Sequence, residues 1–291
     1  MFPSFIGIGA QRAGTGWLYR NLAKHPDIWL TPLKELHYFD NPNEVDSMGS
    51  RFRSSTWRRQ CAARMLRDCF PGSRGTLRWD LRYFFGRRSD DWYASLFLPN
   101  KYQISGEITP AYSILDSGSV GHIRKIMPDV KIVFLMRNPI SRAWSHAINR
   151  LVRRDKLEFE DIQTSRFIEL IESEASRLRT DYMRTIRIWE SHFSRDQIFY
   201  GFYDDLVNKP DELLADICTF LQVDPQKLKL EGSSREQVKP KMGSRYEMPH
   251  EAKVHAAKKY RADIVELSSR FGTHAEQWRL DVNTIIDSAA T

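Results

Sequence analysis

The chain has 291 residues, of which 41% are hydrophobic and 28% are charged, and its formal net charge is +7. This length allows one large α/β domain or two small ones, and the composition excludes a disordered chain. No apolar run approaches the roughly 18 residues that a membrane-spanning helix needs, and the N-terminus has no signal-peptide pattern. Cys61, Cys69 and Cys218 are too few for a disulfide framework and form no Cys-x-x-Cys pair. We therefore expect a reducing compartment, by default the cytoplasm, no transmembrane segment and no metal site.

Positive charge is concentrated in residues 51–88. This segment holds eleven arginines and two aspartates, which give it a local charge of +9. Such a density is typical either of a solvated helical face or of an electropositive wall that faces an anionic ligand. We do not expect a nucleic-acid partner, since the sequence carries no helix-turn-helix, zinc-finger or RNA-recognition signature.

Taken in chain order, hydrophobic patterns and turn residues predict five strands with helices between them. The predicted strands are Phe5–Gly9, Ile28–Leu30, Gln103–Glu107, Lys131–Met136 and Gln197–Phe202. The predicted helices are Thr15–Lys24, Ser55–Asp68, Gly118–Ile126, Ile140–Arg153, Phe159–Leu178, Tyr182–His192, Pro210–Leu221 and Glu251–Phe271. This alternation predicts an α/β fold with a central, mainly parallel sheet flanked by helices, in a single domain over residues 1–291. The stretch 41–100 interrupts the alternation and reads as an insertion.

A glycine turn joins the first predicted strand to the first predicted helix. The segment Gly9–Trp17 reads GAQRAGTGW. Free backbone amides meet in such a turn, and the following helix N-terminus favours negative charge, so the segment predicts an anion site. The glycine spacing resembles a P-loop, but Thr15 follows Gly14 where an ATPase or kinase needs lysine. The basic residue is Arg12 instead, which indicates a different phosphate-like ligand.

A second motif follows the most apolar predicted strand. Arg137 stands directly after Lys131–Met136, and Ser145 lies about two turns into the next helix. Ligands of open α/β sheets bind beyond the carboxyl ends of the strands, where the planar guanidinium of Arg137 can bind a phosphate in a fork. Ser145 is placed to donate to the same phosphate.

Together these two motifs resemble the sulfotransferases that use 3′-phosphoadenosine 5′-phosphosulfate (PAPS). In that family the first loop holds the 5′-phosphosulfate, and a motif R-x-P-x-x-R-x-x-S holds the 3′-phosphate. Further segments resemble the glycosaminoglycan and bacterial branch of the family, in the same order along the chain. They are Lys34–Asp40 (KELHYFD), Gly106–Tyr112 (GEITPAY), Asp204–Leu206 (DDL) and the tail Tyr260–Trp278.

The resemblance implies a P-loop-like three-layer fold and the transfer of a sulfuryl group from PAPS to a hydroxyl or amine of an acceptor. The acceptor would be a small molecule or carbohydrate, bound in part by the insertion 41–100, and the product would be adenosine 3′,5′-bisphosphate (PAP). The implied donor contacts are Gln11, Arg12, Ala13, Gly14, Thr15, Gly16, Trp17, Arg137 and Ser145, with a looser match at Arg245.

The resemblance also implies catalytic roles. Glu35 would be the general base, Arg12 and the amides of residues 13–17 would neutralise charge on the leaving phosphate, and His37 would orient the acceptor or share the base role. Glu35 two residues before His37 in a strand would place both side chains on one face.

Three positions depart from the family pattern. Arg12 replaces the usual lysine of the first loop, Ile108 replaces a frequent lysine, and Gly16 replaces a serine or threonine. Two alternatives remain open from the residues alone. One is a nucleotide-dependent phosphotransferase, weakened by the missing P-loop lysine and the lack of a convincing magnesium-ligand aspartate. The other is a non-catalytic nucleotide- or polyanion-binding module that uses the arginine-rich segment. The sequence leaves the acceptor and the oligomeric state open.

Overall fold

Five parallel strands form a central sheet in the order β2-β3-β1-β4-β5. The computed structural model describes residues 1–40, 59, 61–64, 77–228 and 245–289. The strands are β1 (Phe5–Gly9), β2 (Ile28–Leu30), β3 (Ile104–Ile108), β4 (Lys131–Met136) and β5 (Ile198–Phe202). Three of them have the predicted bounds, β3 is shifted by one residue, and β5 begins one residue later than predicted.

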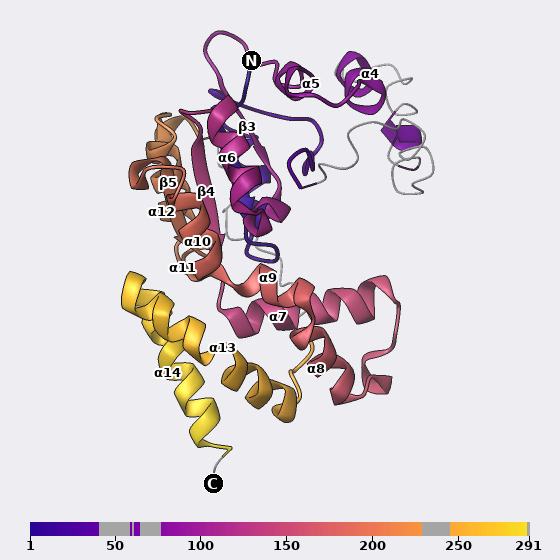
Figure 1. Cartoon of the computed structure of the whole chain (residues 1–291), viewed down its shortest axis with the longest axis vertical. Helices are drawn as coiled ribbons and strands as arrows, with labels where there is room; N and C mark the ends of the chain where they lie inside the picture. Colours follow the sequence, from indigo (N-terminus) through magenta and orange to yellow (C-terminus); the bar gives the residue numbers. More distant parts are fainter. Residues whose placement is uncertain (41–58, 60, 65–76, 229–244, 290–291) are drawn as a thin grey trace.

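Helices cover both faces of this sheet. Successive side chains of a strand point to opposite faces. All five residues of β1 and five of the six in β4 are buried, so neither face is open to solvent. The predicted α/β fold with a parallel sheet flanked by helices is confirmed. A parallel sheet also brings every carboxyl strand end to one edge, and in Figure 1 the helices α7, α8 and α9 lie beyond the end of β4.

The described helices extend the predicted set. They are α1 (Thr15–Leu22), α4 (Leu77–Phe85), α5 (Asp90–Ser95), α6 (Ser117–Ile126), α7 (Pro139–Ile148), α8 (Thr164–Glu172), α9 (Glu174–Thr180), α10 (Tyr182–Glu190), α11 (Tyr203–Asn208), α12 (Pro210–Phe220), α13 (His250–Phe271) and α14 (Thr273–Asp287). A π-helical segment, η3 (Asn149–Arg154), continues α7, and short 3₁₀ turns include η2 (Pro110–Ile114) and η4 (Phe159–Asp161). Helices α4, α5, α11 and α14 were not predicted.

The single helix predicted over Phe159–Leu178 is wrong. The structure has η4, α8 and α9 there, because Gln163 and Ser173 adopt extended backbone conformations. The Ser173 side chain accepts a hydrogen bond from the amide of Ser176 and so begins a new helix. The predicted helix over Ile140–Arg153 is likewise α-helical only to Ile148. Of the helix predicted over 55–68, only residues 59 and 61–64 lie within the described part, and these are helical.

Of the insertion 41–100, the structure describes residues 59, 61–64 and 77–100. The remaining positions lie outside the described residues. The described end of the insertion, helices α4 and α5, is joined internally by the bond from the Trp79 indole nitrogen to the carbonyl of Leu96, and Tyr93 of α5 ties it to the sheet by donating to Oε1 of Glu107 in β3. Cys61 and Cys218 are buried free thiols. Within the described ranges, no helix combines the length and the hydropathy needed to cross a bilayer.

Candidate active site

The segments singled out in the sequence lie at or beyond the ends of all five strands and meet at one edge of the sheet. β1 lies at the centre, between β3 and β4. The chain therefore leaves β1 at the point where the strand order reverses, which is where ligands bind in open α/β sheets. The loop after β1 has the loop after β4 on one side and those after β3 and β2 on the other.

The turn after β1 depends on Gly14. Its φ is 100°, in the left-handed region, and it caps the N-terminus of α1. A Cβ atom at this position would lie 2.3 Å from Cδ1 of Leu206 in α11, so a larger residue has no room there. The tight turn brings the backbone of the loop against α11 and aims the N-terminus of α1 at the sheet edge.

The loop amides do not all face outward. The amide of Ala13 donates to the carbonyl of Ala10, and the amide of Trp17 donates to the carbonyl of Gly14. The prediction that all amides of 13–17 meet a ligand is therefore corrected to those of Gly14, Thr15 and Gly16, which precede the first intrahelical bond. Trp17 and Ala13 instead have buried side chains in the core.

The side-chain oxygen of Gln11 needs a hydrogen-bond donor. Its side-chain oxygen Oε1 is buried and has no hydrogen-bond partner among the described residues. Buried polar atoms are nearly always hydrogen-bonded in folded proteins, because leaving one unsatisfied costs about 1–3 kcal/mol. A ligand that donates to this oxygen would remove that cost.

Arg12 joins the two motifs directly. Its Nε donates to Oγ of Ser145 over 3.1 Å, and its Nη1 donates to Oδ1 of Asn149 over 3.3 Å. Nη1 of Arg137 in turn donates to the carbonyl of Arg12 over 3.2 Å. Residues predicted separately as phosphosulfate and phosphate ligands thus form one connected group, although 133 positions separate Arg12 from Ser145.

The same group is strongly electropositive. Burial, together with the nearby charges of Arg137, Arg153, Arg142 and Arg154, lowers the pKa of the Arg12 guanidinium to about 10. A cationic neighbourhood of this kind destabilises each guanidinium and attracts an anion that would neutralise it. Arg137 is additionally held flat over the ring of Tyr203, with Cζ 4.5 Å from the ring centroid.

Glu35 and His37 do not lie in a strand. β2 ends at Leu30, and the backbone φ angles of Glu35 and His37 are 70° and 53°. The prediction that a strand places them on one face is wrong, because left-handed conformations, which cost roughly 1–2 kcal/mol each, turn the chain here. The two side chains nevertheless meet: Nε2 of His37 lies 3.4 Å from Oε2 of Glu35.

A line of alternating charges runs through this loop. Nζ of Lys34 donates to Oε1 of Glu35 over 2.6 Å, and Nδ1 of His37 lies 2.7 Å from Oδ2 of Asp40. Burial raises the pKa of Glu35, but the hydrogen bond from His37 and the charge of Lys34 outweigh burial and lower it to about 2. Hydrogen bonds to Asp40 and Glu35 raise the pKa of His37 to about 9. At neutral pH the loop therefore holds an ionised Glu35 beside a protonated His37.

Comparison with known proteins agrees with this geometry. A profile described as "Sulfotransferase family" matches residues 3–227. The chain belongs to the sulfotransferase family. A search of curated proteins gives no significant match.

Solved sulfotransferase structures share the fold. A sulfotransferase from Alicyclobacillus acidocaldarius has a TM-score of 0.65 at 22% identity, covering 96% of this chain and 99% of that one. The sulfotransferase domain of the Synechococcus PCC 7002 olefin synthase has a TM-score of 0.55 at 20% identity, covering 99% and 94%. Mouse sulfotransferase SULT7A1, complexed with PAP, has a TM-score of 0.51 at 13% identity, covering 97% and 89%.

The C-terminal tail of this sulfotransferase packs against α11. Nε1 of Trp278 donates to Oδ1 of Asp204 over 3.2 Å, and Nε2 of His274 lies 2.7 Å from Oδ1 of Asp205. Both aspartates belong to α11, which also supplies Tyr203 under Arg137. The DDL segment and the tail Tyr260–Trp278 are therefore in direct contact, next to the tyrosine that lies under Arg137.

Two residues near the site were not singled out as site residues in the sequence. His146 on α7 is a neighbour of Arg12, and burial together with several arginines lowers its pKa to about 4. Arg142, the second of the two arginines in the R-x-P-x-x-R-x-x-S motif, is fully buried and binds the hydroxyl and carbonyl of Ser176. Arg245 is exposed at the border of the described residues. Its contact with the donor stays a prediction.

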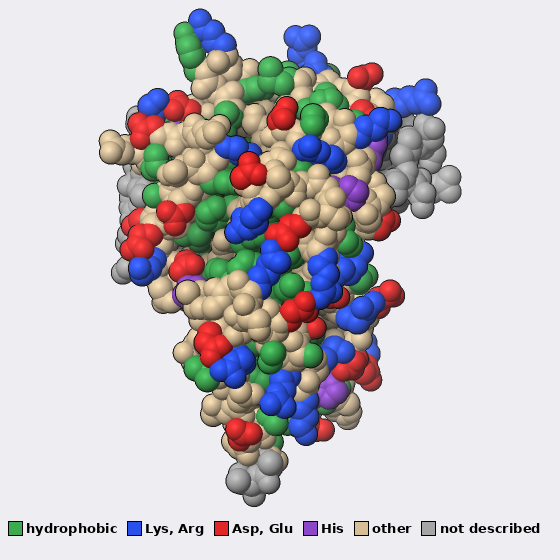
Figure 2. Space-filling model, turned by 60° about the vertical axis from the view of Figure 1, so that its left-hand side comes forward, with side chains coloured by type: hydrophobic (Ala, Val, Ile, Leu, Met, Phe, Trp, Pro, Cys, Tyr) green, Lys and Arg blue, Asp and Glu red, His purple; other side chains and the backbone are tan. Residues whose placement is uncertain are grey.

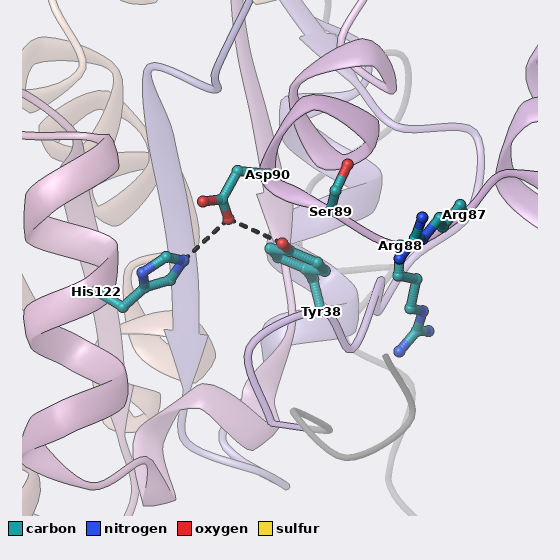
Figure 3. Close-up of a pocket in the computed structure, with 6 residues that line it drawn as sticks. All are labelled: Tyr38, Arg87, Arg88, Ser89, Asp90 and His122. Atoms are coloured by element: carbon teal, nitrogen blue, oxygen red, sulfur yellow. Dashed lines mark hydrogen bonds and ion pairs between the residues drawn. The ribbon is translucent and has the colours of Figure 1, made fainter. Parts of the chain in front are cut away.

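An open pocket lies beside the Glu35–His37 loop. It has a volume of about 560 Å³ and is lined by Tyr38, Arg87, Arg88, Ser89, Asp90 and His122. In Figure 3, Asp90 is drawn bonded to both Tyr38 and His122, at 2.8 and 2.9 Å. Nη1 of Arg88 donates to the carbonyl of His37 over 3.2 Å, so the pocket wall is tied to the loop.

Three of the described arginines of the segment 51–88 contact other parts of the protein itself. Arg64 pairs with the buried Asp80, Arg82 donates to the carbonyl of Ser95, and Arg88 lies over the ring of Trp92. On the face shown in Figure 2, basic and acidic side chains are interspersed. The match to the sulfotransferase family supports an enzyme over a polyanion-binding module.

Proposed function

We propose that the chain transfers a sulfuryl group from PAPS to a hydroxyl or amine of a small-molecule or carbohydrate acceptor. The observation that carries the proposal is the contact between Arg12 and Ser145, with Arg137 bound to the carbonyl of Arg12. It joins an amide-bearing glycine turn to a group of guanidinium charges, as a ligand with two separate phosphate-like groups requires. The PAP complex of the mouse structure, which has the same fold, supports this choice of ligand.

The residues present fit such a donor. The amides of Gly14, Thr15 and Gly16, together with Arg12, would bind the 5′-phosphosulfate, and Arg137 with Ser145 would bind the 3′-phosphate. The electropositive neighbourhood that lowers the pKa of Arg12 becomes favourable once anionic groups lie within it. The buried oxygen of Gln11 supplies an acceptor for a donor group of the ligand.

The protonation states divide the catalytic roles. Glu35, ionised at neutral pH, would take the proton from the acceptor while the acceptor's bond to sulfur forms and the bond from sulfur to the phosphate oxygen breaks. Because its pKa is about 2, Glu35 is a weak base, and proton transfer has to come late, when the acceptor atom has become acidic. His37 carries a proton already, so it orients the acceptor and stabilises charge. Arg12 would neutralise the leaving phosphate.

The acceptor would enter through the pocket of Figure 3. Tyr38 follows His37 in the chain, and Arg88 binds the carbonyl of His37, so the pocket wall is connected to the loop that carries the proposed base. Arg87, Arg88, Ser89 and Asp90 all come from the insertion 41–100, which supports its role in acceptor binding. Two guanidinium groups beside hydroxyl and carboxylate groups suit a hydroxylated acceptor that carries an acidic group.

The test is transfer of radioactive sulfuryl from PAPS to a panel of acidic and neutral sugars and small alcohols. Wild type should label at least one acceptor, and Glu35→Gln should lower kcat by roughly 10²–10⁴, the usual contribution of a general base. Transfer of phosphate from ATP to the same panel, with none from PAPS, would contradict the proposal. Normal kcat in a folded Glu35→Gln variant would remove Glu35 as the base.

A further inference from the structure

Glu107 is a buried carboxylate that the catalytic roles above do not use. It lies in β3, and its side chain is fully buried. Burying an ionised carboxylate is unfavourable unless hydrogen bonds satisfy it. Burial raises the pKa of Glu107, and hydrogen bonds from three hydroxyl groups and from the backbone amide of Leu36 act in the opposite direction. Tyr93 donates over 2.6 Å and Tyr112 over 3.0 Å to Oε1, and Thr109 donates over 2.7 Å to Oε2.

Two of these hydroxyls continue to the catalytic loop. Oγ1 of Thr109 accepts the amide of Leu36 over 3.0 Å, and the hydroxyl of Tyr112 accepts the amide of Tyr38 over 3.1 Å. A hydroxyl has one proton to donate. Because each donates that proton to the carboxylate, its oxygen is left to accept an amide. Glu107 therefore determines which group donates and which accepts in both series of hydrogen bonds.

The two backbone amides that donate to these hydroxyls belong to Leu36 and Tyr38, which alternate along the chain with the proposed catalytic residues Glu35 and His37. Leu36 stands between Glu35 and His37, and Tyr38 follows His37. Both catalytic residues adopt left-handed backbone conformations, which persist only where surrounding contacts impose them. The bonds at Leu36 and Tyr38 supply such contacts on both sides of His37.

We propose that Glu107 is a positioning residue that acts through Thr109 and Tyr112 to hold the backbone of Glu35 and His37 in its catalytic arrangement. This inference rests on the proposed function, since it concerns the same base. It gives the segment GEITPAY a role distinct from donor binding.

The chain offers a matched pair of variants. Tyr93→Phe and Tyr112→Phe each remove one hydroxyl that donates to Oε1 of Glu107, and both rings are buried. Only Tyr112 also accepts an amide of the catalytic loop. A purely structural network would make the two variants alike, whereas a positioning network would separate them. Thr109→Val tests the second chain, and it remains informative if Glu107→Gln fails to fold.

The experiment measures kcat, PAP affinity and thermal unfolding for each variant. We expect Tyr112→Phe and Thr109→Val to lower kcat about 10-fold or more, Tyr93→Phe to change it less than about 2-fold, and PAP affinity to stay within about 2-fold in all three. In a background that carries both Glu35→Gln and His37→Asn, Tyr112→Phe should cause no further loss, because both groups that it positions are gone. Equal kcat values for the tyrosine variants, or a full additional loss in that background, would overturn the inference. Failure of wild type to use PAPS would instead contradict the proposed function.

Discussion

The pH dependence of kcat/KM distinguishes Glu35 from His37 as the base. The pKa of Glu35 is lowered to about 2 and that of His37 is raised to about 9. Since kcat/KM reports the ionisations of the free enzyme, the two assignments predict opposite profiles above neutrality. If Glu35 is the base, its carboxylate is fully formed at pH 6–8 and kcat/KM is flat there. It then falls to about half near pH 9 as His37 loses its proton.

The opposite assignment has a large signature. A histidine with this raised pKa is neutral in only about 1% of molecules at pH 7 and in about half at pH 9, so kcat/KM would rise roughly 50-fold between them if His37 were the base. The assay is initial-rate sulfuryl transfer from PAPS to an acceptor whose hydroxyl does not titrate in this range.

Two controls accompany the profile. PAP affinity is measured at each pH, because Arg12, with its pKa lowered to about 10, begins to lose its charge at the upper end. His255→Asn, which alters a histidine paired with Glu172 away from the site, should leave the profile unchanged. His37→Asn should remove the fall near pH 9. A rise of kcat/KM with pH in wild type would refute Glu35 as the base.

Three further variants follow from the geometry. Gly14→Ala places a methyl group 2.3 Å from Leu206 at a left-handed φ. The free energy of unfolding, measured by denaturant titration, should therefore fall by about 1–3 kcal/mol. Gly16→Ala is the control, because its methyl group has no contact under 3.6 Å and should change the free energy of unfolding little. Arg12→Ala should lower kcat by about 10²–10³; an effect on acceptor KM alone would mean that the donor lies elsewhere. Trp278→Phe loses the bond to Asp204 and should lower the free energy of unfolding by about 1 kcal/mol, with no change meaning that the tail does not support α11.

The sheet and the donor motifs were predictable because their signals are local. The apolar run of β4 and the glycine turn after β1 each determine their conformation through neighbouring residues. The contact of Arg12 with Ser145 joins distant parts of the chain and was not predicted, because the family resemblance assigned the two residues to separate phosphate-like groups.

The conformation of the loop 34–40 could not be predicted, because it depends on residues that are distant in the sequence. Glu35 and His37 take left-handed conformations, and the neighbouring amides of Leu36 and Tyr38 donate to the hydroxyls of Thr109 and Tyr112, more than 70 positions away. No pattern within residues 34–40 shows those bonds. Ser173 shows the same limit on a smaller scale, since one side-chain cap breaks a region whose apolar spacing predicts a continuous helix.

Calorimetric titration with PAP tests the central claim most directly, with ATP and AMP as controls and Arg137→Ala as the matched variant. Binding of PAP without comparable binding of ATP or AMP, and its loss in Arg137→Ala, is the expected result. Equal or tighter binding of ATP, or unchanged PAP affinity in the variant, would contradict the donor site proposed here.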